Sequence, residues 1–471
     1  MAMDRARSQS VSASGSRKRV KTLPISVLYL IIVGFLLLGY WFFNKGFAYI
    51  GYKSIFVGEI TLAIGLFAMF AGGGSLRILR SPIIWMLFLF LTWQVLIAVP
   101  GISKFGLLGV RDSVIWIYSI FAVLVSAALL RSHAFTKAPQ WYFHFMPAWV
   151  IVAPVVFLLP LLFPQAIPNF PGTDVPVLTM KPGDMGVHIG GAAAFLALGL
   201  HRQFRRSISR NPAVQEIYLW TFLLIGLVAC GSRNRGGLVS ALLACAFVAL
   251  FKPMNRMTKM VLPLLIVMMF AFAIDLKVPA GQGREISLGQ ITDNIVSVFV
   301  KTDRGALEGT ERWRKEWWAR IIDDTLYGDY FWTGIGYGPS LAVRHGFADS
   351  TGNRSPHNGH LTFLARSGVP GLALWIVLNG TIFFGLLRVV FAAQAARQPA
   401  FANLAIWVMA YLLSFNLNAS VDVILEGPQG GIWFWCLVGY AIALIEESRQ
   451  LLPRAAAAQL QRDRRPMRRR A

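Results

Sequence analysis

Residues 354–371, RSPHNGHLTFLARSGVPG, combine the start of a helix with side chains that can move a proton. Ser355 is a favourable N-cap and Pro356 suits the first helical position, so His357 and Asn358 are expected in the first helical turn. The positive end of the helix dipole disfavours an imidazolium there, which predicts a neutral His357 that accepts a proton. This pattern indicates general base chemistry.

The same segment predicts a broken helix. Gly368, Pro370 and Gly371 interrupt the helical pattern before the apolar run 372–391. We therefore expect a short half-helix resting on the membrane, followed by a full span. His360 lies three residues after the first histidine, but no third or fourth ligand is near, so no metal site is predicted.

A second chemical feature is the turn SRNRGG at residues 232–237, which opens an apolar run. Amide groups at a helix N-terminus, the small Gly236 and Gly237, and the guanidinium groups of Arg233 and Arg235 together predict an anion site. Phosphate is the expected ligand. Snorkelling to lipid phosphates explains one such arginine, and less readily two in so short a turn.

The longest polar interval, residues 277–356, is expected to lie outside the membrane. Within it, GTERWRKEWWARIIDD predicts a helix rich in Arg and Trp at the lipid interface, with Thr310 as its cap and Arg312 in its first turns. The run TGIGYG at 333–338 predicts a glycine turn that lets the chain approach a helix or a ligand closely.

Other polar residues have simpler interpretations. His188, one turn into an apolar run, is expected to be a hydrogen-bonded packing residue. Arg111 and Asp112 are expected to form a local ion pair at the mouth of a span. Asp422 and Glu426 lie in a late outer loop, where they could counter the arginines or help to hold a sugar. The sequence does not decide between these two roles.

The composition excludes a soluble globule, because 56% of the 471 residues are hydrophobic and only 14% are charged. A bilayer core takes about 20 apolar residues per helix, and the chain has runs suited to an all-α bundle of about twelve transmembrane helices. The cysteines fall in apolar runs and predict no disulfide framework. The predicted spans are 25–44, 55–71, 82–100, 112–130, 144–163, 185–201, 215–230, 236–251, 260–276, 371–391, 401–417 and 430–445.

Basic residues predict the orientation, since Lys and Arg gather in cytoplasmic loops. The net charge of +23 is then mostly a topology signal with attraction to anionic lipids, and nucleic-acid binding is not expected. Both termini are predicted to be cytoplasmic. The expected organisation is a disordered basic tail at 1–24, nine spans within 25–276, a periplasmic loop at 277–356, a half-helix and three spans within 357–446, and a basic cytoplasmic tail at 447–471.

Three stretches, taken in their order, resemble the bacterial O-antigen ligase and polymerase superfamily, membrane glycosyltransferases that use undecaprenyl-diphosphate-linked glycans. They are the SRNRGG turn, the pattern of Arg312 and Trp317 followed by GIGYG at 334–338, and HNGHLTFLARSGVPG beginning at His357. The resemblance covers residues 185–446, and the earlier spans match only in hydropathy.

The resemblance implies that periplasmic arginines hold the lipid diphosphate and that the histidine of the HN motif acts on the acceptor hydroxyl. In this chain these residues are Arg235, Arg312 and His357. The family's single Ser-Arg-Gly is replaced by SRNRG at 232–236, so Arg233 and Arg235 both remain candidates for the main phosphate contact. The residues expected to support the site are Asn358, His360, Arg111 and His188.

The expected activity is transfer of a glycan from an undecaprenyl-diphosphate carrier to an acceptor hydroxyl, at the periplasmic face of the bacterial inner membrane. Arginines would stabilise charge on the leaving phosphate without a metal or cofactor, and attack from the opposite side would invert the anomeric centre. The acceptor is a glycan or a lipid core. The sequence distinguishes neither ligase from polymerase nor one sugar from another.

The alternative is a lipid-linked oligosaccharide flippase or transporter without covalent chemistry. A transporter is expected to show broken helices in both halves and ionisable groups at mid-membrane. This sequence has one broken segment, and its polar residues gather at the outer face, which favours the enzyme. A glycosyltransferase that uses polyprenyl monophosphate sugars is expected to carry acidic residues in the first outer loop, and residues 44–54 have none.

Overall fold

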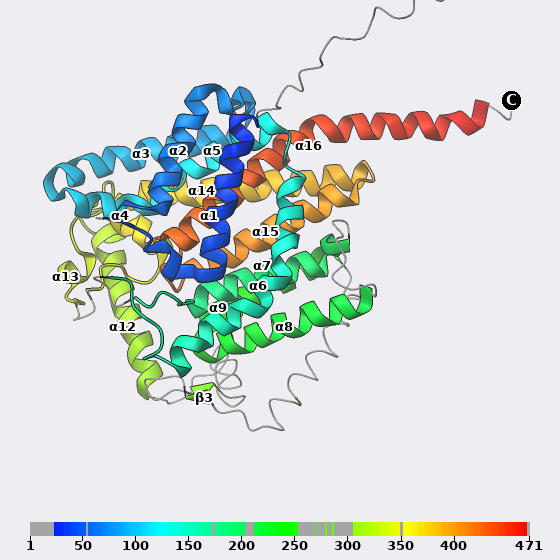
Figure 1. Cartoon of the computed structure of the whole chain (residues 1–471). Coiled ribbons are helices and arrows are strands. Elements are labelled where there is room, and N and C mark those ends of the chain that lie inside the picture. Colours follow the sequence, from blue (N-terminus) through cyan, green and yellow to red (C-terminus); the bar gives the residue numbers. More distant parts are fainter. Residues whose placement is uncertain are drawn as a thin grey trace, which may run out of the picture.

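The structure is a computed structural model of the chain that describes residues 23–52, 55–171, 175–202, 212–252, 269, 278–279, 285–286, 305–348 and 352–468. The described part is an all-α bundle (Figure 1), as expected from the composition. Its strands are two antiparallel pairs of two-residue strands, β1 (Gly51–Tyr52) with β2 (Ile55–Phe56) and β3 (Val278–Pro279) with β4 (Glu285–Ile286).

The helices follow the apolar runs of the sequence. In the first half they are α1 (Ile25–Ala48), α2 (Val57–Ala68) with a π-helical end (Met69–Gly73), α3 (Pro82–Phe105), α4 (Leu107–Ile117), α5 (Ile120–Ser132), α6 (Lys137–Leu162) and α7 (Pro182–Ala197). They continue with α8 (Pro212–Arg233), α9 (Arg235–Phe251), α12 (Gly305–Ile322) with a π-helical end (Asp323–Tyr327), α13 (Leu341–His345), α14 (Gly359–Ala395), α15 (Pro399–Ala419) and α16 (Pro428–Arg468). Short 3-10 turns lie at Leu76–Arg80 and Leu200–Arg202.

Eleven of the twelve predicted spans fall on described residues, and each of these runs is helical. Within the described residues, seven helices are long and apolar enough to cross a membrane, or eight if α4 and α5, bent by 43°, form one span. Helices α7 and α9 and the segment Val57–Gly73 are shorter, so the count of twelve stays a prediction. The predicted span 260–276 lies outside the described residues, apart from residue 269, as do residues 1–22 of the predicted tail 1–24 and most of 277–304.

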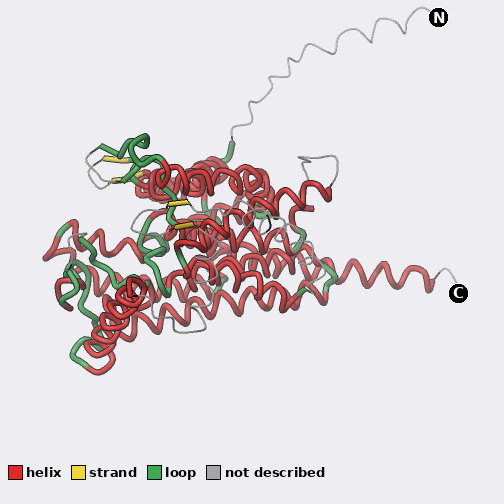
Figure 2. The backbone as a smooth tube through the Cα atoms, turned by 90° about the horizontal axis from the view of Figure 1, so that it is seen from below, coloured by secondary structure: helices red, strands yellow, loops and turns green. Residues whose placement is uncertain are grey.

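The loops, helix ends and short helices that connect the long helices lie at two opposite ends of the bundle. We call one the outer end, after the predicted topology; it holds residues 181–184, 232–237, 305–348, 352–358 and 420–427. The inner end holds residues 75–81, 132–137, 200–202, 396–398 and 446–457. Figures 1 and 2 show α12, α13 and most of the connecting loops at the outer end, while α16 projects from the inner end. The segments predicted to share one side of the membrane therefore lie together.

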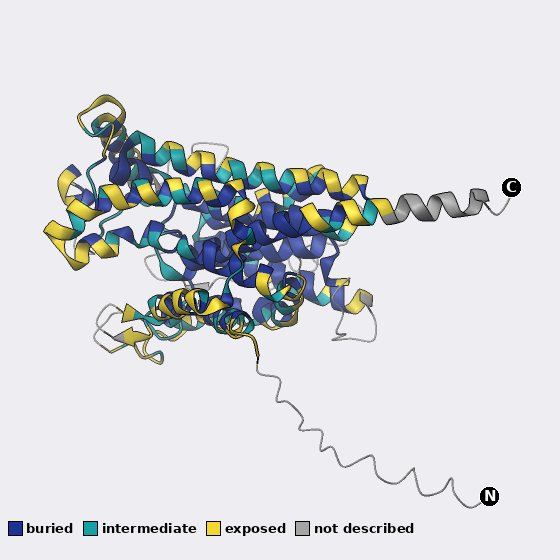
Figure 3. Ribbon diagram, turned by 90° about the horizontal axis from the view of Figure 1, so that it is seen from above, coloured by how far each residue is buried: buried dark blue, intermediate teal, exposed yellow. Residues whose placement is uncertain are grey.

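The core lies where α5, α7, α15 and α16 pass through the middle of the bundle (Figure 3). Trp41 stacks on Tyr142 and Trp149 there, with ring centroids 4.8 and 5.1 Å apart. Close packing of α7 against α9 depends on glycine: a Cβ atom at Gly186 would lie 2.5 Å from the Gly237 carbonyl oxygen. The small residue at position 186 thus lets the two helices approach closely.

Helix α14 is broken at Ser367 and Gly368, as the glycines predicted, and Gly368 has a φ of +70°. A break in a membrane helix is costly unless other groups bond the freed backbone. Neighbouring segments supply those bonds here. The Ile335 amide donates to the Ala365 carbonyl (2.7 Å), and the Gly336 amide donates to the Arg366 carbonyl (3.1 Å). The Trp93 indole donates to the Ser367 carbonyl (3.0 Å). The Val369 amide, just after the break, donates to the Phe331 carbonyl (2.8 Å).

The glycine turn at 333–338 therefore approaches a helix, one of the two possibilities the sequence left open. A Cβ atom at Gly334 would lie 2.6 Å from backbone atoms of Arg366 and Gly368, so only glycine fits. Next to it, the buried Tyr337 donates a hydrogen bond to Gln94 of α3 (2.6 Å). The turn ties the outer segment 305–348 to the break in α14.

The outer segment has a small core of its own, built by α12 and α13 against the first half of α14. It contains Trp317, Ile321, Leu341, Phe347 and Leu364. The predicted cap at Thr310 is wrong, because α12 begins five residues earlier at Gly305. Alanine, leucine and glutamate at 306–308 favour the helix, so nothing stops it from starting before the threonine.

Candidate functional site

His357 lies just before α14 and not in its first turn, so the predicted cap at Ser355 is wrong. Asn358 is the N-cap, and its side-chain oxygen accepts hydrogen bonds from the amides of His360 (3.1 Å) and Leu361 (3.0 Å). Asparagine caps helices as well as serine does, and the Ser355 hydroxyl instead donates to Glu426 (2.7 Å).

The backbone of His357 is in the left-handed region, with a φ of +54°. A bulky side chain in this region is unfavourable, and such residues gather at functional sites. The segment is fixed from α12: the Trp318 indole donates to the Pro356 carbonyl (2.8 Å), and the Trp313 ring lies 6.1 Å from the imidazole. The imidazole keeps 31% of its side-chain surface exposed, so a substrate hydroxyl can reach it.

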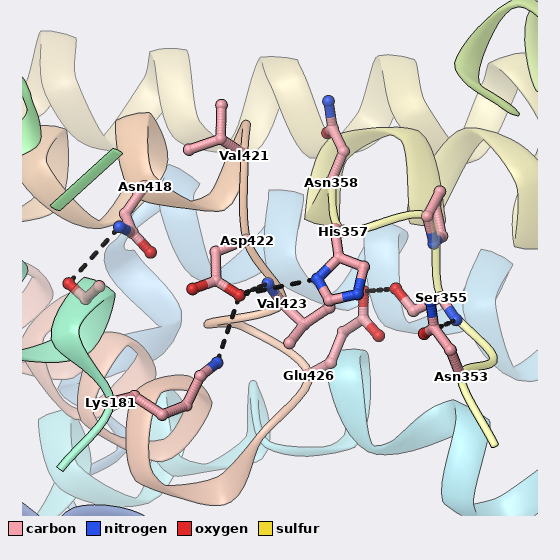
Figure 4. A network of polar contacts seen from close by, with 12 residues as sticks. Lys181, Asn353, Ser355, His357, Asn358, Asn418, Val421, Asp422, Val423 and Glu426 are labelled. Atoms are coloured by element: carbon pink, nitrogen blue, oxygen red, sulfur yellow. Dashed lines mark hydrogen bonds and ion pairs between the residues drawn. The ribbon is translucent and has the colours of Figure 1, made fainter. Parts of the chain in front are cut away.

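Asp422 faces His357 from the loop between α15 and α16 (Figure 4). Its Oδ1 lies 4.0 Å from the imidazole Nδ1, too long for a hydrogen bond but close enough to stabilise a positive charge. The same oxygen accepts from Lys181 Nζ (3.2 Å) and from the Val423 amide (2.7 Å). Burial raises the pKa of Asp422, but Lys181, the Val423 amide and His357 together lower it further, to below its usual value. Asp422 is therefore a carboxylate.

Lys181 is the second charge of this cluster and was not singled out from the sequence. It precedes α7 and lies between Asp422 and the buried Asp184, whose Oδ1 is 4.0 Å from Nζ. Burial lowers the pKa of Lys181, but Asp422 and Asp184 raise it more, so the ammonium stays charged. Asn44 and Gln429 donate to the other Asp184 oxygen (3.1 and 3.3 Å).

The SRNRGG turn is tighter than expected, since only Asn234 separates α8 from α9. Asn234 caps α9 by accepting a hydrogen bond from the Gly237 amide (2.7 Å). A Cβ atom at Gly236 would lie 2.4 Å from Val421, next to Asp422, and one at Gly237 would lie 3.0 Å from the Pro182 carbonyl. The two glycines therefore bring the turn against the Asp422 loop and the start of α7.

Arg233 and Arg235 flank the Asn234 cap at the outer end, and both are half-buried. Their roles as phosphate contacts stay a prediction. Arg312 on α12 is exposed. The arginine of α12 that reaches the Asp422 loop is Arg314, which donates to the Val421 carbonyl (3.2 Å). Helical geometry turns the side chains at 312 and 314 to different faces of α12; the sequence analysis named Arg312 and did not consider Arg314.

Three residues predicted to support the site have other surroundings: His360 and His188 bond residues other than His357 and Asp422, and Arg111 is exposed. Both nitrogens of His360 are occupied, Nδ1 by the Trp375 indole (2.9 Å) and Nε2 by the Asn416 carbonyl (2.9 Å), which leaves no atom for a metal. His188 bonds the Tyr411 hydroxyl (2.5 Å) in the buried core, as its packing interpretation predicted. Arg111 is exposed on α4.

The predicted local ion pair of Arg111 and Asp112 is wrong. Asp112 instead pairs with Arg354 and Arg366, each at 2.9 Å. It also accepts from the Gly338 amide (3.1 Å). The Asp112 carboxylate thus joins α4 to the glycine turn and to both sides of the His357 segment. Two arginines distant in sequence therefore take the place of the neighbouring Arg111.

Glu426, the other acidic residue of the late loop, is half-buried beside this cluster. It accepts hydrogen bonds from the hydroxyls of Ser355 (2.7 Å) and Thr362 (2.8 Å). Burial raises the pKa of Glu426 above its usual value despite these bonds. Its contacts position the chain beside His357 and do not counter the arginines of the SRNRGG turn.

The arrangement is a charged surface at the outer end: an imidazole lies beside a carboxylate, Lys181 pairs with that carboxylate, and Arg314 contacts the same loop. Such a surface can accept a proton from a hydroxyl and hold a diphosphate. The described residues contain no group of three or more His, Cys, Asp or Glu side chains placed to hold a metal ion.

Comparison with protein families gives a match over the part of the chain that carries most of these residues. Residues 220–376 match the family described as O-antigen ligase. The resemblance to the O-antigen ligase and polymerase superfamily is confirmed. The matched segment includes the SRNRGG turn, α12, the glycine turn and His357. Comparison with curated proteins finds no match.

The O-antigen ligase match supports a multi-pass membrane enzyme that acts on lipid-linked glycans. Asp422 and Lys181 lie outside the matched segment, yet both touch the site that this segment builds. Sequence reasoning noted Asp422 and missed Lys181. The signal was present, because a lysine directly before Pro-Gly-Asp at a helix start is placed to meet an outer loop.

Proposed function

We propose that the chain transfers a glycan from an undecaprenyl-diphosphate carrier to an acceptor hydroxyl at the periplasmic face of the membrane. His357 is the general base, and Asp422 stabilises the imidazolium that forms when the base takes the proton. Arg235 and Arg233, with Lys181, Arg312 and Arg314 nearby, bind the diphosphate. The observation that carries the proposal is the half-exposed imidazole 4.0 Å from a buried carboxylate that also binds Lys181.

The chemistry follows from the charges. The acceptor hydroxyl has a very high pKa, so it attacks the anomeric carbon only as its proton passes to a base. The bond from the anomeric carbon to the phosphate oxygen breaks at the same time, and negative charge grows on the departing diphosphate. Guanidinium groups fixed around that oxygen stabilise this charge. Attack opposite the departing phosphate inverts the anomeric centre.

The proton has a defined path. With Nδ1 turned towards Asp422, the base is Nε2, and the proton on Nδ1 faces the carboxylate. When Nε2 takes a proton, the imidazolium gains the attraction of Asp422 across 4.0 Å. This is the orientation that a carboxylate beside a catalytic histidine usually gives.

The surface glycan of a strain that lacks this chain tests the proposal. Short chains accumulating on the lipid carrier are expected for a polymerase, and full-length chains that stay on the carrier are expected for a ligase. A strain with an unchanged surface glycan and an unchanged pool of lipid-linked glycan would contradict both. A strain in which lipid-linked glycan accumulates on the cytoplasmic face would indicate a flippase instead.

Metal independence is part of the proposal, because arginine and lysine side chains supply the positive charge. Product formation by membranes that contain the chain is expected to continue in excess chelator. Complete loss of product that an added divalent cation restores would contradict this part of the proposal. Loss that no cation restores would point to damage by the chelator itself, and a second chelator of different chemistry would test that.

A further inference from the structure

A groove of about 490 Å³ lies at the inner end, at the opposite end of the bundle from His357. The start of α3, the second half of α14 and the middle of α16 form its walls. Most of the lining is apolar, and the residues used below are Ile83, Phe384, Gly385, Ala392 and Ile445. Gly385 lets the helices meet at the bottom of the groove, since a Cβ atom there would lie 2.8 Å from Ile445.

Two arginines line this apolar groove, and one of them has no acidic partner among the residues that the structure describes. Arg388 lies about two turns before the end of α14, roughly 10 Å along the helix axis. Its guanidinium stacks on the Phe384 ring at 4.5 Å, and it forms no ion pair with a described carboxylate. An arginine inside a membrane span is costly unless a partner or the lipid headgroup compensates its charge.

The second arginine, Arg449, lies across the groove on α16. It pairs with Glu446 (2.6 Å) and donates to the Arg80 carbonyl (3.4 Å), yet 45% of its side chain remains exposed. The other carboxylate nearby, Glu447, is taken by Arg77 (3.1 Å). Both acidic groups at this position are therefore used, and the groove keeps an excess of positive charge.

We propose that this groove binds an anionic phospholipid. One acyl chain lies along the apolar walls, and the headgroup phosphate is held by Arg388 and Arg449. Guanidinium groups suit phosphate because they donate two parallel hydrogen bonds. Basic pockets between membrane helices on the cytoplasmic side are suited to such headgroups. The inference rests on the inner end alone and does not depend on the proposed function.

The test is native mass spectrometry of the full chain in detergent, titrated with phosphatidylglycerol or with phosphatidylcholine of the same acyl chains. Phosphatidylglycerol is expected to bind at least about tenfold more tightly, because its headgroup has a net negative charge, whereas the choline cation of phosphatidylcholine cancels the phosphate charge and is repelled by the two arginines. Arg388→Gln and Arg449→Gln should each remove most of this preference. Arg131→Gln is the matched control, since Arg131 is exposed on α5 at the same end.

Equal affinity for the two lipids, or an equal effect of Arg388→Gln and Arg131→Gln, would overturn the proposal. Inorganic phosphate at the same concentration should not displace the lipid, and displacement would mean that the groove is a simple anion site. Ala392→Phe keeps both arginines and fills the groove, so it should weaken both lipids. Unchanged binding in that variant would show that the acyl chain lies elsewhere, even if an arginine variant fails to fold.

Discussion

The two ends of the bundle use charge in different ways. At the inner end each described carboxylate has a close basic partner, as in Arg77 with Glu447 (3.1 Å) and His201 with Glu216 (2.9 Å). At the outer end the carboxylates Asp184 and Asp422 share one lysine, and Arg314 of α12 contacts the loop that carries Asp422. Closed pairs hold a scaffold together, whereas the outer cluster places charged groups beside a half-exposed histidine, where a charged substrate can meet them.

His357→Ala is the sharpest way to break this comparison. Loss of a general base costs about 100- to 10,000-fold in rate, so product should disappear while the chain still inserts. Product is measured as glycan released from the lipid carrier by membranes of matched protein content. His360→Gln is the control: its imidazole bonds only Trp375 and Asn416, so it should lower stability more than rate. Equal rates in the two variants would remove His357 from the mechanism.

Asp422→Asn tests the carboxylate beside the base. The substitution keeps the shape but removes the charge that stabilises the imidazolium and holds Lys181. A fall in kcat of about 100-fold is expected, a loss of roughly 3 kcal/mol in the transition state. Glu426→Gln in the same loop is the matched control, because its partners are hydroxyls that an amide oxygen also accepts from. If Glu426→Gln were as slow as Asp422→Asn, the loop would need both acidic residues, and the effect would not be specific to the carboxylate beside His357.

The two arginines of the turn give a smaller effect. Arg235→Ala is expected to weaken donor binding about tenfold or more, the value of a charged hydrogen bond, and to do so more than Arg233→Ala. The measurement is KM for a lipid-diphosphate donor, with expression and insertion checked for both variants. The reverse order would exchange their assigned roles. The KM of Arg314→Ala shows whether the α12 arginine that contacts Val421 also binds the lipid-diphosphate donor.

Much of the scaffold could be predicted from the sequence, because hydropathy reports directly on burial in lipid. The break in α14 could be predicted too, because Gly368 and Pro370 both disfavour a continuous helix at that point. The start of α14 could not. Ser355 and Asn358 are equally good caps, and a hydrogen bond from Ser355 to a glutamate 71 residues away decides between them.

The site itself could be predicted only in part, for the same reason. Local patterns identified the histidine and the SRNRGG turn. The charged residues beside His357 come from distant parts of the chain: Lys181 and Asp422, which pair there, are 241 residues apart. Asp112 likewise bonds two distant arginines and not its neighbour. No spacing rule along one sequence reports which loops meet in space.

A pair of glycines sharpens the comparison at the backbone level. Gly334 and Gly336 both have positive φ, of +64° and +80°. A Cβ atom at Gly334 would collide with the backbone at the α14 break, whereas one at Gly336 meets nothing within 4 Å. Gly336→Ala should therefore cost only the left-handed conformation, about 1 kcal/mol. Gly334→Ala should cost well over that and lower activity, measured by unfolding in mixed detergent; equal costs would contradict the packing of the turn.

The smallest effect concerns His345, a histidine of the outer end that is not part of the site. Its Nδ1 accepts from the Trp317 indole (3.0 Å) and its Nε2 donates to Asp324 (3.2 Å). Burial lowers the pKa of His345 more than Asp324 raises it. The unfolded segment then takes up a proton near pH 6.5 that the folded one refuses, so stability is present above that pH and is lost as the pH falls below it.

The loss is at most about 1.4 kcal/mol per pH unit for one proton. Hydrogen exchange of residues 312–348 at pH 7.5 and 5.5 should therefore show faster opening at the lower pH, and His345→Gln should remove the difference. Exchange that slows at low pH would reverse the sign and mean that Asp324 dominates the pair. Acid should therefore act through His345 on the stability of the segment whose Trp318 indole holds the Pro356 carbonyl beside His357.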